Sequence, residues 1–240
     1  MSSLIALKPR AVALLRAAIL FAAKADAREQ LTAVCVDPDP AAGRVRIVAT
    51  DKNMMFVATA PARLYGKTAP VLLFAASLKP ALSAFRAADI RRAGVLAIDS
   101  GSRYARLSLV LADARVAIED VLRDRENEIV SAFAQMVDAS YVDYRRALPT
   151  PGAVQQATPP AAVAPKLLGT ICKAAELLDD RPKVASHVHV RFFAADEHGP
   201  QCAAISSDAI AAVMPMRADS AEYAEYAEYA EYADVYATIF

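Results

Sequence analysis

The sequence predicts an α+β fold built from a repeated β-α-β-β-β unit, with helices on one side of largely antiparallel sheets. Short segments of alternating apolar and polar residues recur along the chain, and single segments with the 3.6-residue apolar period of a helix interrupt them. This order of elements occurs twice and then a third time less clearly. Because each unit has a helix face and a sheet to bury, we expect neighbouring units to cover one another.

The first unit begins with a strand and a helix. Pro9 suits the first turn of a helix, and the apolar residues that follow it recur at helical spacing from Val12 to Ala22. The alternating segments on either side are bounded by turn residues, including an Asp-Pro-Asp-Pro run. Strands are therefore expected at residues 3–7, 31–36, 44–50 and 54–60.

The second and third units repeat this order. The second has a strand at residues 70–74, a helix near 76–88, and strands at 94–98 and 103–110, with further strands after them. The third follows Pro160, with a helix at about 163–178 and strands at 187–193, 202–206 and 210–215. Residues 149–160 are rich in Pro and include a Gly, which indicates a linker between the two parts.

Composition indicates a globular chain, because 56% of its 240 residues are hydrophobic. The longest early apolar run, residues 11–23, is broken by Arg16 and is too short to span a bilayer. No small-residue cleavage site follows a cationic start, so we expect a cytoplasmic protein without a membrane partner. The three cysteines, Cys35, Cys172 and Cys202, are far apart and are expected to be buried thiols.

Residues for catalysis or metal binding do not form a recognisable pattern. His187 and His189 alternate along one predicted strand and His198 follows near a turn, which supplies too few ligands for a metal site. Ser206, Ser207 and Asp208 lie near these histidines, but there is no GxSxG turn and no phosphate-binding glycine loop. We therefore expect no enzyme activity, no catalytic residue, no metal and no cofactor.

Charge is distributed unevenly although the formal net charge is zero. The three predicted helical segments and their flanks carry eleven lysines and arginines against four acidic residues. Residues seven or fourteen apart on a helix share a face, which pairs Lys79 with Arg86, Lys166 with Lys173, and Arg10 with Lys24. Such a surface either contacts phosphates without reading bases or is an ordinary solvated helix face.

Three short segments carry the most specific signal. They are Val48-Ala-Thr-Asp-Lys-Asn-Met-Met55, Tyr141-Val-Asp-Tyr-Arg-Arg-Ala-Leu-Pro149 and Val213-Met-Pro-Met-Arg217. In order and approximate spacing they resemble three pieces of the peptide-binding pocket of the bacterial DNA polymerase III β sliding clamp family. In that family the segments follow a strand, join two domains and end the protein, and they meet to hold short motifs of polymerases and repair proteins.

The resemblance implies a fold of the DNA-clamp, or processivity, type with a reduced domain set. Residues 1–150 resemble the family's complete middle domain, and residues 151–217 resemble half of its final domain. A leading domain is expected to be absent, as in a short relative of phage, prophage or plasmid type. Residues 218–240 contain four Ala-Glu-Tyr repeats, which form no apolar face and indicate a disordered acidic tail.

The resemblance also implies two sets of functional residues. The partner-peptide pocket would be lined by Leu31, Thr50, Met54, Met55, Arg146, Ala147, Val213, Met214, Pro215 and Met216, with Arg217 at its rim. The cations facing DNA would be Arg10, Arg16, Lys24, Lys79, Arg86, Lys166 and Lys173. Flexible methionines suit a pocket that accepts apolar anchors from many partners.

Departures from the family pattern lie within the pocket itself. Lys52, Asn53 and Met54 stand where the family usually has Gly-His-Arg, and Val142 stands where a proline is usual. Taken singly, these motif residues also have structural interpretations. Asp51 suits a turn, Tyr144 and Met214 suit a core, and Arg145 suits a surface ion pair.

The expected function is that of a non-catalytic, clamp-like processivity factor. It would hold double-stranded DNA without sequence preference and tether a DNA polymerase or other clamp-binding peptides, with or without a clamp loader. A homo-oligomer is expected, because three units per chain would need four chains to reach the twelve units of a family ring. The alternative is a truncated relative that captures or blocks clamp-binding partners without forming a ring.

Overall fold

The computed structural model describes residues 3–26, 28–66, 69–111, 127–148, 155–156, 165–179, 191–194 and 201–213. In chain order the elements are β1 (Ser3–Leu7), α1 (Ala11–Ile19), η1 (Glu29–Thr32), β2 (Ala33–Asp39), η2 (Pro40–Ala42), β3 (Arg44–Thr50), β4 (Met54–Tyr65), β5 (Val71–Phe74), α2 (Ala75–Ser83), α3 (Ala87–Arg92), β6 (Val95–Ser100), β7 (Tyr104–Val110), β8 (Glu128–Gln135), η3 (Tyr144–Ala147), β9 (Gln155–Gln156), α5 (Pro165–Leu178), β10 (Arg191–Ala194), β11 (Gln201–Ser206) and β12 (Ala209–Val213).

Two antiparallel sheets form the first part of the chain, and each contains strands of both repeats. Strand β1 pairs with β6, which continues through β7 to β8, while β5 pairs with β2, which continues through β3 to β4. The two repeats therefore exchange their first strands and become one packed body. This arrangement confirms the predicted α+β class with repeated β-α-β-β-β units.

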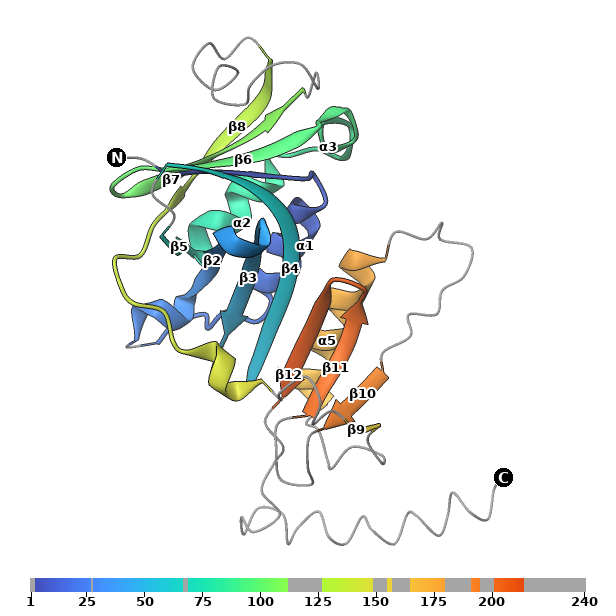
Figure 1. Cartoon of the computed structure of the whole chain (residues 1–240). Helices are drawn as coiled ribbons and strands as arrows, with labels where there is room; N and C mark the ends of the chain where they lie inside the picture. Colours follow the sequence, from blue (N-terminus) through green and yellow to red (C-terminus); the bar gives the residue numbers. More distant parts are fainter. Residues whose placement is uncertain are drawn as a thin grey trace, which may run out of the picture.

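Strand β4 joins the two sheets, and it is the long curved strand in Figure 1. Its first half pairs with β12 and its last residues pair with β1. Pro61 lies between the residues of β4 that pair with β12 and those that pair with β1, and it has no N–H to donate to a neighbouring strand. The next residue, Ala62, donates its N–H to the carbonyl of Gly43 at 3.0 Å.

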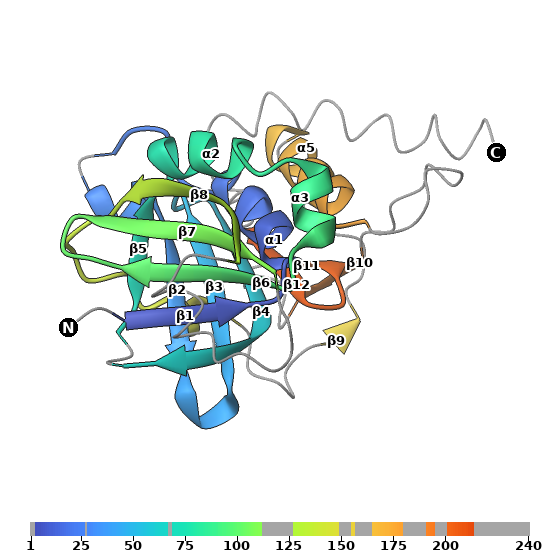
Figure 2. The same ribbon diagram turned by 90° about the horizontal axis from the view of Figure 1, so that it is seen from above.

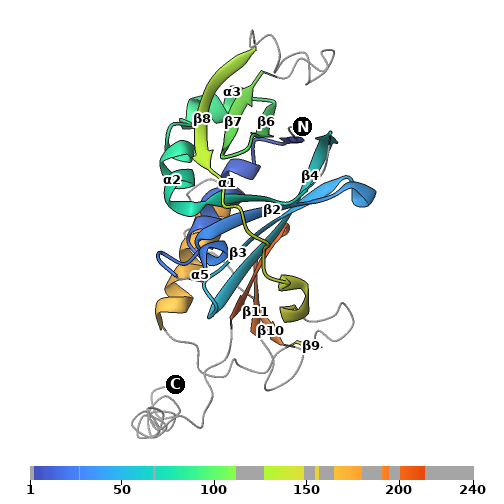
Figure 3. The ribbon, with the colours of Figure 1, turned by 90° about the vertical axis from the view of Figure 1, so that its left-hand side faces the viewer.

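The third unit extends the second sheet beyond β4. Residues Met54 to Ala58 of β4 pair with Val213 to Ala209 of β12, and β11, β10 and β9 follow in that order. Helix α5 packs beside α1 and buries Ile171, Ala174, Ala175 and Leu178 in the same core cluster. Figures 2 and 3 show α1, α2 and α5 on one side of the strands, as the sequence predicts.

Two predicted helices are wrong in extent. The predicted helix at residues 76–88 is two helices, because α2 ends at Ser83 and Arg86 is extended before α3 begins. Phe85 lies in this break and is fully buried, so the turn brings an aromatic side chain into the core. Helix α1 ends at Ile19, and Leu31 lies in η1 and not in the strand that was expected to start there.

Candidate functional site

The first motif forms a turn that is held by its own side chains. Thr50 donates its hydroxyl to the carbonyl of Met54 at 2.8 Å and accepts the N–H of Lys52 at 3.2 Å. The Asp51 carboxylate accepts the N–H groups of Asn53 and Met54, each at 3.0 Å. The prediction that Asp51 is a turn residue is therefore confirmed, and the turn connects the end of β3 to the start of β4.

Lys52 is strained in this turn, with a φ of 85°. Residues with a side chain rarely adopt this left-handed conformation, whereas glycine adopts it readily. Lys52 stands where the resembling family usually has glycine, so the backbone keeps a glycine conformation without the glycine. Its ammonium forms an ion pair with Asp26 at 2.5 Å, and this contact lowers the pKa of the Asp26 carboxyl.

Strand pairing brings four of the predicted pocket residues to one end of the sheet. Thr50 lies opposite Met55, and Met54 lies opposite Val213. Residues directly opposite in antiparallel strands share a face, and successive residues alternate between faces. Thr50 and Met55 therefore lie on one face, while Met54 and Val213 lie on the other face, in the core beneath the helices.

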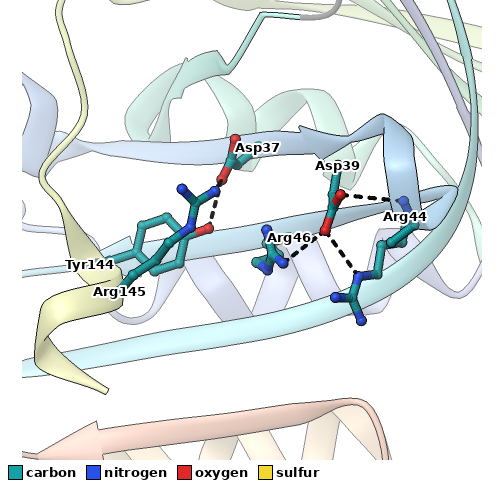
Figure 4. A network of polar contacts seen from close by, with 7 residues as sticks. Asp37, Asp39, Arg44, Arg46, Tyr144 and Arg145 are labelled. Atoms are coloured by element: carbon teal, nitrogen blue, oxygen red, sulfur yellow. Dashed lines mark hydrogen bonds and ion pairs between the residues drawn. The ribbon is translucent and has the colours of Figure 1, made fainter. Parts of the chain in front are cut away.

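The second motif covers the first of these two faces. Tyr144 of η3 is buried in a cluster that runs from β2 across β3 and β4 to β12 and includes Met55 and Ala212, so η3 packs on this face of the sheet. Figure 4 shows the Tyr144 hydroxyl and the Arg145 guanidinium directed at the Asp37 carboxylate, at 2.6 and 2.8 Å. Burial and the adjoining Asp37 carboxylate raise the pKa of Tyr144 to about 12. Tyr144 is thus a core residue and Arg145 forms an ion pair, as their structural interpretations predict.

The remaining predicted pocket residues are not part of the cluster around Met55, or they lie outside the described residues. Arg146 forms an ion pair with Asp143 at 2.9 Å, but its side chain is 88% exposed, so this pair contributes little to stability. Ala147 is exposed beside it, and Leu31 is buried in η1 against β2 and β3. Met214, Pro215, Met216 and Arg217 lie outside the part of the chain that the structure describes.

A separate cavity of about 380 Å³ lies between the segment after α1 and the end of β8. Its lining mixes charges of both signs, from Lys24, Asp26, Glu29 and Asp138, with the apolar side chains of Phe74 and Met136. No residue of the predicted pocket lines it, so it is not the predicted peptide site.

The predicted DNA-facing cations divide into two groups. Lys24, Lys79, Arg86, Lys166 and Lys173 are exposed. Only Lys166 and Lys173 lie on one continuous helix, α5, as their spacing predicts. The shared helix face expected for Lys79 with Arg86 is wrong because α2 ends before Arg86, and that expected for Arg10 with Lys24 is wrong because α1 begins after Arg10 and ends before Lys24.

Arg10 and Arg16 are partly buried and bind other parts of the chain. Arg16 donates to the carbonyls of Leu82 and Phe85, at 2.7 and 2.9 Å, and so caps the C-terminal end of α2. Arg10 forms a two-point ion pair with Asp208 between β11 and β12, with Nε–Oδ2 and Nη2–Oδ1 distances of 2.6 and 3.1 Å. These contacts give both arginines a structural role.

Sequence reasoning missed Asp37 and Asp208, which organise these contacts. A signal for Asp37 was available, because it shares a strand face with Ala33 and Cys35, and a carboxylate on such a buried face needs a partner. Nothing in the local pattern around Asp208 predicts its bond to Arg10, which lies 198 residues away in sequence.

The expectation of three buried thiols is wrong for one cysteine. Cys35 and Cys202 are buried, and burial raises their pKa values to about 12 and about 11. Cys172 is exposed, because α5 buries Ile171, Ala174, Ala175 and Leu178 and turns Cys172 away from that face.

Among the described residues, no three His, Cys, Asp or Glu side chains are grouped as metal ligands, and the three histidines lie outside this part of the chain. None of the helices in the described ranges is long and apolar enough to cross a membrane.

Comparisons with known proteins identify the fold. No protein-family model and no curated protein matches the sequence. Among solved structures, the chain is similar to the Helicobacter pylori β clamp bound to a DNA ligase peptide, with a TM-score of 0.63 and 11% identity over 90% of this chain and 66% of that one. It is also similar to the DNA polymerase III β subunit of Thermotoga maritima, with a TM-score of 0.60 and 14% identity over 90% of this chain and 66% of that one.

A third similar structure is the sliding clamp of Pseudomonas aeruginosa bound to griselimycin, with a TM-score of 0.57 and 14% identity over 89% of this chain and 65% of that one. The present chain thus spans slightly less than two thirds of the length of these proteins. The resemblance predicted from three short motifs is confirmed at the level of the fold: the chain has the fold of the bacterial DNA polymerase III β sliding clamps.

Proposed function

We propose that this chain is a non-catalytic, sliding clamp-like processivity factor in the cytoplasm. It holds double-stranded DNA without sequence preference and tethers a DNA polymerase or another partner through a hydrophobic peptide site. The observation that carries the proposal is the pairing of β12 with β4 in a clamp fold, which sets Val213 opposite Met54 and Ala212 opposite Met55. The end of the first motif segment and the start of the third are therefore neighbours, which supports a common site.

The peptide site is proposed at the end of this seam. Thr50 and Met55 form a buried wall on the face against which Tyr144 of η3 packs, and Arg146 and Ala147 are exposed on the same short helix. Met54 and Val213 support the wall from the opposite face of the sheet, and Leu31 lies buried in η1. The chain continues from Val213 into the remaining residues proposed for the pocket, which are Met214, Pro215, Met216 and Arg217.

DNA is proposed to lie against the helices. Lys166 and Lys173 are exposed on α5 and Lys79 is exposed on α2, and these two helices lie on one side of the strands. Lys24, which follows α1, and Arg86, which precedes α3, are also exposed. Lysine and arginine contacts to phosphates release counterions, so this binding should weaken steeply with salt and should not depend on sequence. Arg10 and Arg16 are not needed for this contact, because they hold other parts of the chain.

The alternative is a clamp relative that captures or blocks clamp-binding partners without closing a ring. The chain spans 66% of the length of these structural neighbours. A closed ring of twelve units would need four chains of three units each, and a clamp loader would be a further partner. Solution mass separates the two proposals, because a monomer or dimer cannot close such a ring.

The deciding experiment measures mass in solution and retention on circular and linearised DNA. A processivity clamp should be a homo-oligomer that stays on closed circles in moderate salt and is released when the circle is cut. A matched variant with Lys166→Glu and Lys173→Glu should lose retention without losing its oligomeric state. A monomer that binds neither form of DNA but still binds peptide would reject the clamp function in favour of the alternative.

A further inference from the structure

Asp37 is a carboxylate on a buried strand. It lies on β2 and is only 9% exposed, and its neighbours on the same strand face, Ala33 and Cys35, are fully buried. A charge in such a place is costly unless it is paired and hydrogen-bonded. Its partners come from η3: the Tyr144 hydroxyl donates at 2.6 Å and the Arg145 guanidinium donates at 2.8 Å (Figure 4).

These two bonds constrain η3 more than either would alone. The donors come from consecutive residues and meet on one oxygen of Asp37, so both the distance of η3 from the sheet and its rotation are limited. The Arg145 guanidinium also lies 5.4 Å from the centre of the Tyr144 ring, a cation–π contact that keeps the two side chains together. Tyr144 in turn packs in the cluster with Met55 and Ala212.

The residues proposed to touch a partner peptide, Arg146 and Ala147, come directly after Tyr144 and Arg145 within η3. Arg146 and Ala147 are both exposed, and Arg146 forms an ion pair with Asp143, which is itself exposed. Their position depends on the anchorage of Tyr144 and Arg145, together with the flanking Tyr141 and Leu148, which pack against the same cluster. The backbone of this segment is attached further upstream, where the N–H of Val137 donates to the carbonyl of Leu72 at 2.9 Å.

We propose that Asp37 is a positioning residue for the partner-peptide site, which holds η3 so that Arg146 and Ala147 stand beside the Met55 wall. This inference rests on the proposed function, because it assumes that a peptide binds at the seam. Asp37 itself makes no contact with the peptide. Its loss leaves every peptide-contacting side chain in the sequence and removes only the fixed placement of η3.

The test uses the full chain and griselimycin, the ligand of the Pseudomonas aeruginosa clamp structure, as the probe. Asp37→Asn removes the charge that holds Arg145 and should weaken griselimycin binding about tenfold, because mobile rim side chains must be ordered on binding. The matched control is Asp39→Asn on the same strand. Asp39 pairs with Arg44 and Arg46 and not with η3, so this variant should bind within about twofold of the wild type.

A second variant and a spectroscopic signal separate positioning from general loss of structure. Tyr144→Phe keeps the ring in the cluster and removes only the hydroxyl, so it should weaken binding in the same direction as Asp37→Asn. In Asp37→Asn the raised pKa of Tyr144, about 12, should fall towards the ordinary tyrosine value. Carbon-13 NMR of labelled tyrosines, with Tyr144→Phe to assign the signal, reports this change in the folded protein.

The outcomes distinguish the inference from the function on which it rests. If the wild type does not bind griselimycin, the peptide site is refuted and the positioning role is refuted with it. If the wild type binds, and both Asp37→Asn and Tyr144→Phe bind equally well while the tyrosine signal shows the contact broken, the positioning role alone is overturned. Weakened binding by both variants beside an unchanged Asp39→Asn supports it.

Discussion

Replacing Arg10 by alanine is expected to loosen the third unit of the chain from α1. Arg10 stands at the start of α1, and its two-point bond to Asp208 fixes the turn between β11 and β12. Its guanidinium also approaches the carbonyl of Leu178 at the end of α5, at a longer 3.5 Å. The Asp208 carbonyl accepts the N–H of Thr59 in β4, so this turn lies where the third unit meets the first unit.

The size of the effect follows from the geometry and the exposure of the pair. Hydrogen bonds between charged groups contribute about 1.5–3 kcal/mol when they are well formed. The side chains of Arg10 and Asp208 keep 30% and 25% of their exposure, so solvent screening reduces this value. We expect Arg10→Ala to lower the free energy of unfolding by about 1–2 kcal/mol, which corresponds to a melting temperature lower by roughly 2–8 °C.

The pH dependence provides a second measure of the same pair. The hydrogen bond from Arg10, aided by that from Ser206 and opposed by burial, lowers the pKa of Asp208 in the folded state. A carboxyl whose folded pKa is depressed contributes stability above its unfolded pKa, about 3.9, and loses it as the pH falls through the folded value. Arg10→Ala should therefore lose less stability than the wild type as the pH falls from about 5 through the folded pKa of Asp208.

Urea unfolding of the two single variants and the double variant tests this reasoning. Arg10→Ala and Asp208→Asn should each destabilise the chain, and their effects should not add, with a coupling of about 1 kcal/mol. DNA retention should be the same for Arg10→Ala and the wild type when both are folded. Unchanged stability together with weaker, less salt-dependent DNA binding would instead return Arg10 to the DNA-facing surface and refute the structural role.

Three further predictions concern other residues. Lys52→Gly should be more stable than Lys52→Ala by about 1 kcal/mol in urea unfolding, because both lose the ion pair but only glycine relieves the positive φ; equal stabilities would contradict the strained turn. Lys173→Ala should reduce the salt slope of DNA binding by about 1, whereas Arg16→Ala should lower the melting temperature and leave that slope unchanged, as titrations at several salt concentrations would measure. Cys172 should be the one thiol of the folded chain that reacts rapidly with a thiol reagent at pH 8, because Cys35 and Cys202 are buried and burial raises the pKa of Cys35 to about 12. Fast reaction of two or three thiols would contradict the core described here.

Much of the local structure was predictable because it depends on neighbours in sequence. The strand predicted at residues 44–50 coincides with β3, and the helix predicted at about residues 163–178 differs from α5 only at its start. Element ends were less predictable, as the division of the second helix at Phe85 demonstrates. That division depends on a core that accepts Phe85, which no local period records.

The candidate site was predictable only in part, for a related reason. Three motifs indicated which segments belong together, and the order of the elements indicated the clamp-like repeat. The faces on which Met54 and Met55 lie follow from the register of β4 with β3 and β12, which a one-residue shift would reverse. The spacing of Arg10 and Lys24 suggested a shared helix face, but neither residue lies within α1.

The sequence by itself thus determined the kinds of elements, their order and the three segments that resemble a clamp pocket. Only the tertiary structure decided that β12 joins β4, that Asp37 holds η3, and that Arg10 binds Asp208 instead of remaining free for DNA. The physical reason is the separation along the chain of the residues that decide each feature. Secondary structure follows from the period of adjacent side chains, whereas the partner of a buried or partly buried charge is chosen by tertiary packing between residues 107 or 198 positions apart.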